Sequence, residues 1–208
     1  MPPISGRTSN PAKQMNQSAS VPNISNVPVS IPKMKKLSEP DQGCFMVVSE
    51  QCHPGLRLGF PNSAKILAGL AGWIVNRLMQ SDTIVEGLQA LFGDTEMFNH
   101  AVENVGNVAK AAEYPGNLFI LVPYVPTDDK VVAFQITITV EYVVTEILAL
   151  AGAHVERLKD QSQFKNQKRE KYEDFPQIRP SDIRLAVNMD EDLKTCFGGL
   201  FKMDSDRK

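Results

Sequence analysis

Val131–Asp160, VVAFQITITVEYVVTEILALAGAHVERLKD, decides the fold together with Ile178–Leu193, IRPSDIRLAVNMDEDL, which follows it after a charged segment. The first piece is long enough for about eight helical turns. From Val143 onward its apolar residues keep the spacing of one helix face. In the second piece, Pro180 suits the first turn of a helix, because a proline there lacks only an N–H that would have no partner. The two pieces therefore predict a long helix, a loop and a short helix.

The residues from Phe134 to Glu141 allow a second interpretation. They alternate between apolar and polar and are rich in β-branched side chains, which is typical of a strand. Local rules alone leave helix and strand equally open. We favour helix because of the family resemblance described next, since packing can override local propensity.

Two motifs in these pieces resemble core histone 2A. EYVVTEILALAG at Glu141–Gly152 is similar to the central helix of that family, and RLAVNMDEDL at Arg184–Leu193 is similar to its following short helix and acidic end. The resemblance is split by a charged insertion, residues 161–177. It implies the second half of a histone fold.

The preceding part of the chain predicts a series of shorter helices. Residues 44–60 predict a short helix that stops before Pro54. Residues 61–80 predict an amphipathic helix that Asn62 or Ser63 can cap. A second helix, capped by Ser81 or Asp82 with Glu86 in support, is expected to run through Phe92 and to end at Gly93, and a third is expected over Thr95–Tyr114.

The order of three motifs in these helices resembles core histone 2B. VVSEQCHPG is similar to the end of its first helix, WIVNRL to its central helix, and MFNHAVENVGNVAKA to its C-terminal helix. The chain departs from the family after Met79, where the central helix is cut short and the basic loop that follows it is missing. Pro123 and Pro126 then leave room only for a short helical turn or an extended link before the 2A-like half.

The resemblance implies an all-α chain in which two fused histone folds pack as an intramolecular handshake heterodimer. The expected units are a disordered N-terminal tail (1–43), a histone 2B-like fold (44–114), a histone 2A-like fold (115–198) and a short C-terminal tail (199–208). This order is similar to the histone doublets of giant DNA viruses, in a shortened form. Fusion would make the pairing intramolecular, at high effective concentration.

Composition limits the function classes. The 208 residues carry a net charge of −2, which argues against a simple DNA-packaging role because DNA-holding proteins usually carry a basic footprint. Three cysteines fit a reducing compartment better than a disulfide scaffold. No signal-peptide core is found, and the lack of a long unbroken apolar run predicts no membrane span.

The N-terminal 43 residues are rich in proline, serine and asparagine, which predicts disorder. They end in a small basic cluster of Lys33, Lys35 and Lys36. Three interpretations stay open for that cluster: a solvated tail without a partner, weak electrostatic contact with nucleic acid, or a short nuclear import signal.

The resemblance implies an acidic recognition site. The family's acidic patch draws carboxylates from the central helix and the later short helix, and the matching residues are Glu141, Glu146, Asp190, Glu191 and Asp192. Ala149 stands where the family has a glutamate. Clustered carboxylates bind arginine side chains through bidentate, charge-assisted hydrogen bonds. The alternative is an ordinary solvated helix end.

DNA contacts, where made, are expected to go mostly to phosphates. The candidates are Arg57, Lys65, Arg77, Lys130, Lys165, Lys168, Arg169, Lys171 and Arg179. For Arg77, a structural salt bridge is an equal alternative. Gln177 occupies a position at which the family has a DNA-contacting arginine, which weakens the predicted footprint.

These observations predict a structural chromatin protein that pairs with histone 3/4-type partners, packages viral DNA with a weak grip, and locates to the virion and to the host nucleus or a viral factory. The alternative is a histone-fold interaction module in transcription or assembly that does not wrap DNA. An enzyme is not expected, because no phosphate loop or nucleophile elbow is present. No cofactor or small-molecule substrate is predicted. No metal is predicted either, because Cys52 and His53 lack two further ligands at suitable spacing.

Overall fold

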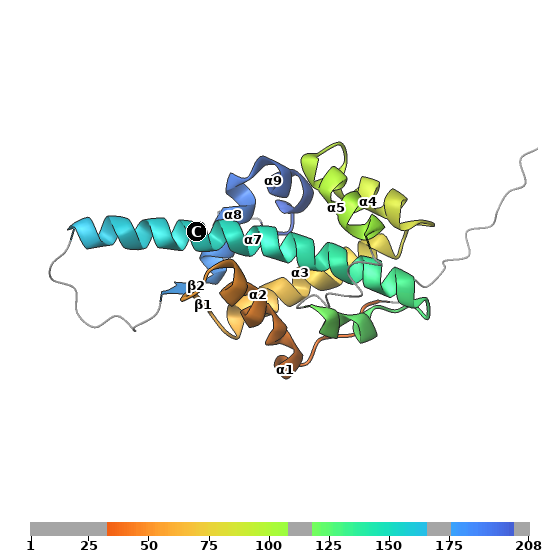
Figure 1. Ribbon diagram of the computed structural model, residues 1–208, viewed down its shortest axis with the longest axis horizontal. Helices are drawn as coiled ribbons and strands as arrows, with labels where there is room; N and C mark the ends of the chain where they lie inside the picture. Colours follow the sequence, from red (N-terminus) through yellow and green to blue (C-terminus); the bar gives the residue numbers. More distant parts are fainter. Residues whose placement is uncertain (1–32, 108–117, 166–175, 202–208) are drawn as a thin grey trace, which may run out of the picture. The chain divides into compact units, whose positions relative to one another are not determined.

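The computed structural model describes residues 33–107, 118–165 and 176–201. These residues are mainly helical, which confirms the predicted all-α class at that level (Figure 1). Within them, the strands are two short segments, β1 (Arg57–Leu58) and β2 (Gln177–Ile178). We refer to residues 33–107 as the first half and to residues 118–165 and 176–201 as the second half.

The long helix α7 (Lys130–Lys165) is the element around which the others pack. It begins after Asp129, whose side chain accepts hydrogen bonds from the N–H groups of Val131 (2.8 Å) and Val132 (3.3 Å) and so satisfies otherwise free donors of the first turn. Figure 1 shows α2 on one side of α7 and α5 and α9 on the other, with α8 crossing α7 between β2 and α9. It contacts elements of both halves.

The prediction of helix over residues 134–141 is confirmed, and the strand interpretation is wrong. Ile136, Thr137, Thr139 and Val140 are all buried, so this part of α7 is covered on several sides rather than on one face. The two threonine hydroxyls satisfy themselves within the helix, donating to the carbonyl oxygens four residues earlier at 2.9 and 3.0 Å. Buried threonines therefore cost little here, and alternation in polarity does not report alternation in exposure.

The first half contains the predicted short helices, which are α2 (Cys44–Cys52), α3 (Asn62–Leu78), α4 (Ile84–Phe92) and α5 (Glu96–Gly106). It also contains α1 (Glu39–Gln42), which was not predicted and lies in the segment expected to be a disordered tail. The end of α4 at Gly93, with φ of 62°, agrees with the prediction, because glycine tolerates this left-handed conformation. Helix α5 ends at Gly106 rather than at Tyr114, and residues 108–114 lie outside the described part of the chain.

The predicted helix caps are wrong. Helix α3 follows Pro61 without a side-chain cap, and Ser63 instead donates from its hydroxyl to the Ile178 carbonyl at 2.9 Å. The cap of α4 is Thr83 rather than Ser81 or Asp82. Thr83 forms a full capping box with Glu86, whose supporting role is confirmed.

The second half contains a 3₁₀ helix, η1 (Phe119–Tyr124), then α7, β2, α8 (Pro180–Met189) and α9 (Glu191–Phe197). The short helical turn expected among residues 115–130 is η1, and Pro180 is the first residue of α8 as predicted. Helix α7 runs on to Lys165, so part of the insertion expected as a loop is helical.

The parallel bridge between β1 and β2 joins the two halves. Arg57 pairs with Gln177 and Leu58 with Ile178. The Gly59 N–H extends the bridge by donating to the Ile178 carbonyl at 2.9 Å. The segment before α3 is thus bonded to the segment after α7.

The expected boundary of the N-terminal tail at residue 43 is wrong. Leu37 and Gln42 are 5% exposed, and the Met34 N–H donates to Asn76 Oδ1 on α3 at 3.0 Å. Packing of these side chains explains why the segment from Lys33 onward belongs with the helices. The rest of the expected tail, residues 1–32, lies outside the described residues.

Buried side chains of both halves form one hydrophobic core. Phe197 at the end of α9 packs edge-on against Trp73 of α3 (ring centroids 5.9 Å apart) and against Phe92 of α4 (6.2 Å). Such geometry is favourable for aromatic pairs.

Helix α7 is apolar enough to bear on the prediction that the chain has no membrane span. Over Lys130–Asp160 it contains a window of mean hydropathy 1.6 and, among the described residues, is the one helix long and apolar enough to span a bilayer by length and composition. Half of that window is buried against other parts of the protein, and the core helix of a folded domain meets the same criteria.

Candidate functional site: an acidic pocket

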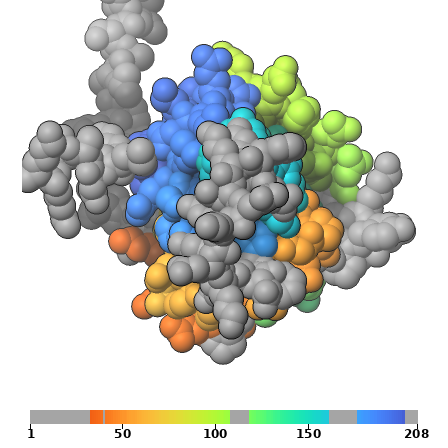
Figure 2. All heavy atoms as spheres, turned by 90° about the vertical axis from the view of Figure 1, so that its left-hand side faces the viewer, coloured from red at the N-terminus to blue at the C-terminus, as the bar shows by residue number. Residues whose placement is uncertain are grey.

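Four carboxylates line a pocket of about 170 Å³, which we call the acidic pocket. Its walls come from α5, α7 and the junction of α8 with α9. The carboxylates are Glu96, Glu146, Asp190 and Asp192, and the remaining lining residues are Met97, His100, Tyr142, Leu150 and Leu193. Figure 2 shows the surface on which the blue residues of α8 and α9 adjoin the green residues of α5, so the two halves meet there.

Local structure holds these carboxylates in place. Asp190 lies between α8 and α9 and caps α9, its Oδ1 accepting a hydrogen bond from the Leu193 N–H at 2.8 Å. Asp192 and Glu96 lie in the first turns of α9 and α5, where the helix dipole favours negative charge. Glu146 projects from the middle of α7. Carboxylates from three helices are therefore presented to one small space.

The electrostatics of the acidic pocket are strongly negative. Burial, followed by the charges of Glu146, Asp192 and Asp190, raises the pKa of Tyr142 to about 12. Burial, followed by the charges of Asp192 and Asp190, raises the pKa of the nearby Cys196 thiol to about 11. Both groups are therefore neutral at physiological pH, and the negative charge of the acidic pocket comes from its carboxylates.

Tyr142 also gives the acidic pocket a defined wall. Its hydroxyl lies 3.4 Å from His100 Nδ1, and the two rings meet edge-on with centroids 6.3 Å apart. A guanidinium group suits this arrangement, because it can donate to several carboxylate oxygens at once and can pack against an aromatic face.

Three of the five predicted acidic residues line the acidic pocket, and two do not. Glu191 is the exposed first residue of α9. Glu141 lies five residues before Glu146, or about 140° away around the helix, and accepts a hydrogen bond from the Leu118 N–H at 3.3 Å. Glu96, the fourth carboxylate of the pocket, was not predicted. The sequence feature that could have identified it is its position directly before MFNHAVEN, in the first turn of the third predicted helix.

The described residues contain no group of three or more histidine, cysteine or carboxylate side chains arranged to hold a metal ion. Cys52 and His53 instead contact the backbone of α7. Cys52 Sγ lies 3.9 Å from the Thr145 carbonyl oxygen, and His53 Nε2 lies 2.8 Å from that of Ala149. These side chains therefore join α2 to α7.

The predicted DNA-contacting residues are spread over several elements. Arg57 is the first residue of β1, Arg179 directly follows β2 as the N-cap of α8, and both are exposed. Lys65 forms an ion pair with Glu39 at 3.7 Å. Arg77 is about 18 Å further along α3, and its Nη1 lies 3.5 Å from Gln80 Oε1, a neutral side chain.

The remaining DNA candidates belong to α7 and the insertion. Lys130 is exposed at the start of α7, and Lys165 is its last residue. Lys168, Arg169 and Lys171 lie outside the described residues. Among the described candidates, Arg57 and Arg179 are the pair that the backbone brings together.

No family model matches the chain, and no curated protein matches it. The resemblance to histones 2B and 2A, drawn from the residues quoted above, therefore stays a prediction.

Proposed function

We propose that this chain is a fused pair of histone folds, 2B-like then 2A-like, that acts as a structural chromatin protein. In this proposal it joins histone 3/4-type partners and double-stranded DNA in a nucleosome-like particle, and its acidic pocket receives an arginine side chain from a further protein. The proposed setting is the packaging of viral DNA in the virion and in the infected cell.

One observation carries the proposal. The resemblance selected carboxylates from positions far apart in the sequence, and Glu146, Asp190 and Asp192 converge on one pocket. Glu96 joins them from the other half, so the pocket combines carboxylates from both proposed histone units. A set of surface acids chosen at random would not be expected to converge in this way.

The arrangement of the helices supports the proposed handshake. In a handshake the long helices of two units cross, so the segment before one lies near the segment after the other. Helices α3 and α7 contact each other, and β1, before α3, pairs with β2, after α7. Their shared core would also explain why the units are fused, because neither long helix can bury its apolar surface alone.

A second candidate is an interaction module that does not wrap DNA. Two observations favour it: the net charge is −2, and Gln177 occupies the position at which the family has a DNA-contacting arginine. In this case the acidic pocket would be the main functional surface.

Nuclease protection separates the two candidates. The purified chain is mixed with histone 3/4-type partners and DNA, and the protected fragment is measured at increasing salt. The proposal predicts a fragment that is lost at modest salt, because a protein with few basic contacts to DNA phosphates loses affinity at a low salt concentration. A stable complex of the histones without any protected DNA would refute packaging and favour the interaction module.

The acidic pocket is tested separately by binding of a labelled arginine-containing peptide. Glu96→Gln with Glu146→Gln keeps the size of both side chains but removes two charges. Each hydrogen bond to a charged group contributes about 1.5–3 kcal/mol, so affinity should fall by about tenfold or more. Glu50→Gln with Glu191→Gln removes two charges from exposed residues outside the pocket and should leave the affinity nearly unchanged. Equal losses in both variants would mean that binding follows net charge rather than the pocket.

A further inference from the structure

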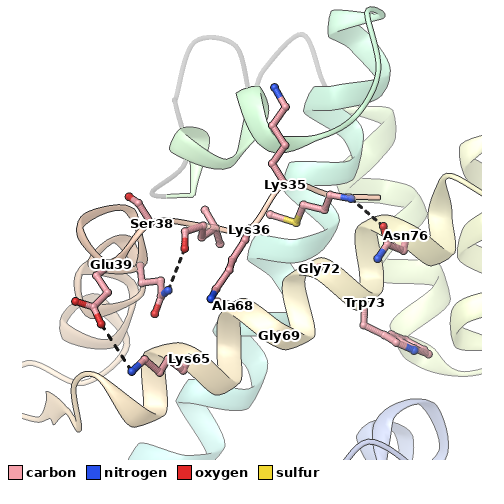
Figure 3. Close-up of a pocket in the computed structure, with 13 residues that line it drawn as sticks. Lys35, Lys36, Ser38, Glu39, Lys65, Ala68, Gly69, Gly72, Trp73 and Asn76 are labelled. Atoms are coloured by element: carbon pink, nitrogen blue, oxygen red, sulfur yellow. Dashed lines mark hydrogen bonds and ion pairs between the residues drawn. The ribbon is translucent and has the colours of Figure 1, made fainter. Parts of the chain in front are cut away.

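A groove of about 860 Å³ runs along α3, between that helix and the segment 33–38. Its lining includes Lys36, Lys65, Ala68, Gly69 and Gly72, with Trp73 towards one end (Figure 3). Figure 3 shows Lys36 reaching from the segment towards Ala68, and Lys65 rising from α3 beside Glu39. The proposed chromatin function uses Lys65 as a DNA candidate but does not use the groove.

The floor of the groove is nearly free of side chains. A Cβ atom at Gly69 would have no neighbour within 4 Å, and one at Gly72 would have only Met34 Sδ, at 3.8 Å. Because α3 presents so little side-chain volume here, the backbone of a bound segment can lie close to the helix. Such close approach suits the narrow backbone of an extended peptide better than a DNA duplex.

A second hollow extends the groove around α3. It measures about 320 Å³, shares Lys65, Gly69 and Trp73 with the first, and adds Arg184 and Phe201 to the lining. The shared residues make the two hollows one continuous surface. Trp73 and Phe201 supply apolar area at this end, where a bound segment can place an apolar side chain.

The charges around the groove are mostly basic. Lys36, Lys65 and Arg184 line it, against one carboxylate, Glu39, whereas the side chain of the further lining residue Lys35 points away from α3 (Figure 3). The Lys65–Glu39 ion pair is 3.7 Å long, and its two side chains are 52% and 68% exposed. Exposed pairs of this kind contribute little, so Lys65 can exchange Glu39 for the carboxylate of a ligand. In a chain of net charge −2, this concentration of cations is complementary to an acidic partner.

We propose that the groove over α3 docks an extended acidic peptide segment of a partner protein, with one apolar residue of that segment against Trp73. The lysines and Arg184 select for carboxylates, and the glycine floor selects for a flat, extended backbone. This site takes a partner of the opposite charge from the one that the acidic pocket takes, and it does not depend on DNA wrapping.

Fluorescence anisotropy with a labelled peptide, in which Asp and Glu residues surround a single Phe, tests the proposal. Gly69→Leu fills the floor of the groove and should also strengthen α3, since leucine favours helix over glycine. Peptide affinity should fall by about tenfold. Gly106→Leu is the matched control, because Gly106 is also helical and has no neighbour within 4 Å, and it should bind as the parent does.

Charge reversal gives the second arm. Lys36→Glu with Lys65→Glu should abolish measurable binding, whereas Lys130→Glu with Lys194→Glu changes the net charge equally but lies outside the groove and should reduce affinity only slightly. Circular dichroism checks that each variant folds. Unchanged binding by Gly69→Leu, or equal losses in the two charge-reversed pairs, would overturn the proposal. A DNA duplex that displaces the peptide and loses affinity in Gly69→Leu would assign the groove to nucleic acid instead.

Discussion

Replacing Gly152 by alanine is expected to destabilise this protein, although the same replacement stabilises most helices. Gly152 is buried in α7, beneath the ring of His53. A Cβ atom there would lie 2.0 Å from His53 Cδ2 and 2.5 Å from both Cγ and Nε2. The ring would have to move by more than 1 Å to reach ordinary contact. That movement would break its 2.8 Å contact with the Ala149 carbonyl and disturb the 3.4 Å approach of Nδ1 to Glu156.

The magnitude follows from three opposing contributions. Loss of the hydrogen bond costs about 0.5–1.5 kcal/mol, and overpacking of a filled site costs about 1–3 kcal/mol. In the opposite direction, alanine stabilises a helix by about 1 kcal/mol relative to glycine. The free energy of unfolding should therefore fall by about 1–3 kcal/mol, and the melting temperature by several degrees. Gly69→Ala, where a Cβ has open space, should instead raise stability by up to about 1 kcal/mol.

Chemical denaturation of both variants measures this contrast, and a double-mutant cycle tests its cause. In a His53→Ala background the clash is absent, so Gly152→Ala should become neutral or stabilising. The coupling between the two positions should exceed about 1 kcal/mol. If Gly152→Ala proves as stable as the parent, or if the two substitutions act additively, then packing of His53 on α7 does not set the requirement for glycine.

Three further predictions concern stability and reactivity. Thr83→Ala removes the capping box of α4 and should lower the free energy of unfolding by about 1 kcal/mol, measured by chemical denaturation; an unchanged value would mean that the box contributes nothing. The pKa of Asp41 lies below its usual 3.8, chiefly because the Ser38 hydroxyl donates a hydrogen bond to its carboxylate. The ionised Asp41 therefore stabilises the fold fully above pH 3.8, and this stabilisation is lost as the pH falls through the lowered pKa. Asp41→Asn should flatten this acid limb in pH-dependent unfolding, and an unaltered limb would assign it to other carboxylates. Burial raises the thiol pKa of Cys44 to about 12 and of Cys196 to about 11, so both should react slowly with iodoacetamide at pH 8 until the protein is unfolded; fast labelling of the native protein would contradict this burial.

The helices were predictable wherever a periodic apolar face coincided with a clear stop. Gly93 ended α4 as expected, because few residues other than glycine adopt its positive φ. The caps were harder to predict, because several polar residues stand together before each helix and tertiary contacts choose among them. Ser63 illustrates this: its hydroxyl is engaged by the distant Ile178 carbonyl and is not used locally.

The acidic pocket shows a similar limit for the site. Motif matching placed Glu141 and Glu146 in one patch because it compares positions along the sequence. Helix phase separates them by about 140°, and Glu141 turns to the Leu118 N–H instead. Glu96 was not predicted because it is distant in sequence from the other carboxylates. It reaches the acidic pocket only because α5 packs against α7. Convergence of residues from separate helices is a property of the packed core and not of any one segment.

That dependence makes the acidic pocket a reporter of the contact between the two halves. Glu96 approaches it from α5, whereas Asp190 and Asp192 approach it from the end of the second half. Packing of Phe197 on Trp73 and Phe92 holds α9, and with it Asp190 and Asp192, against the first half, and it buries aromatic surface that either half alone would expose to water. An arginine side chain that reaches all three carboxylates can do so only while this aromatic contact is intact. By linkage, a ligand in the acidic pocket must then stabilise the association of the halves by the same free energy that the association contributes to its binding.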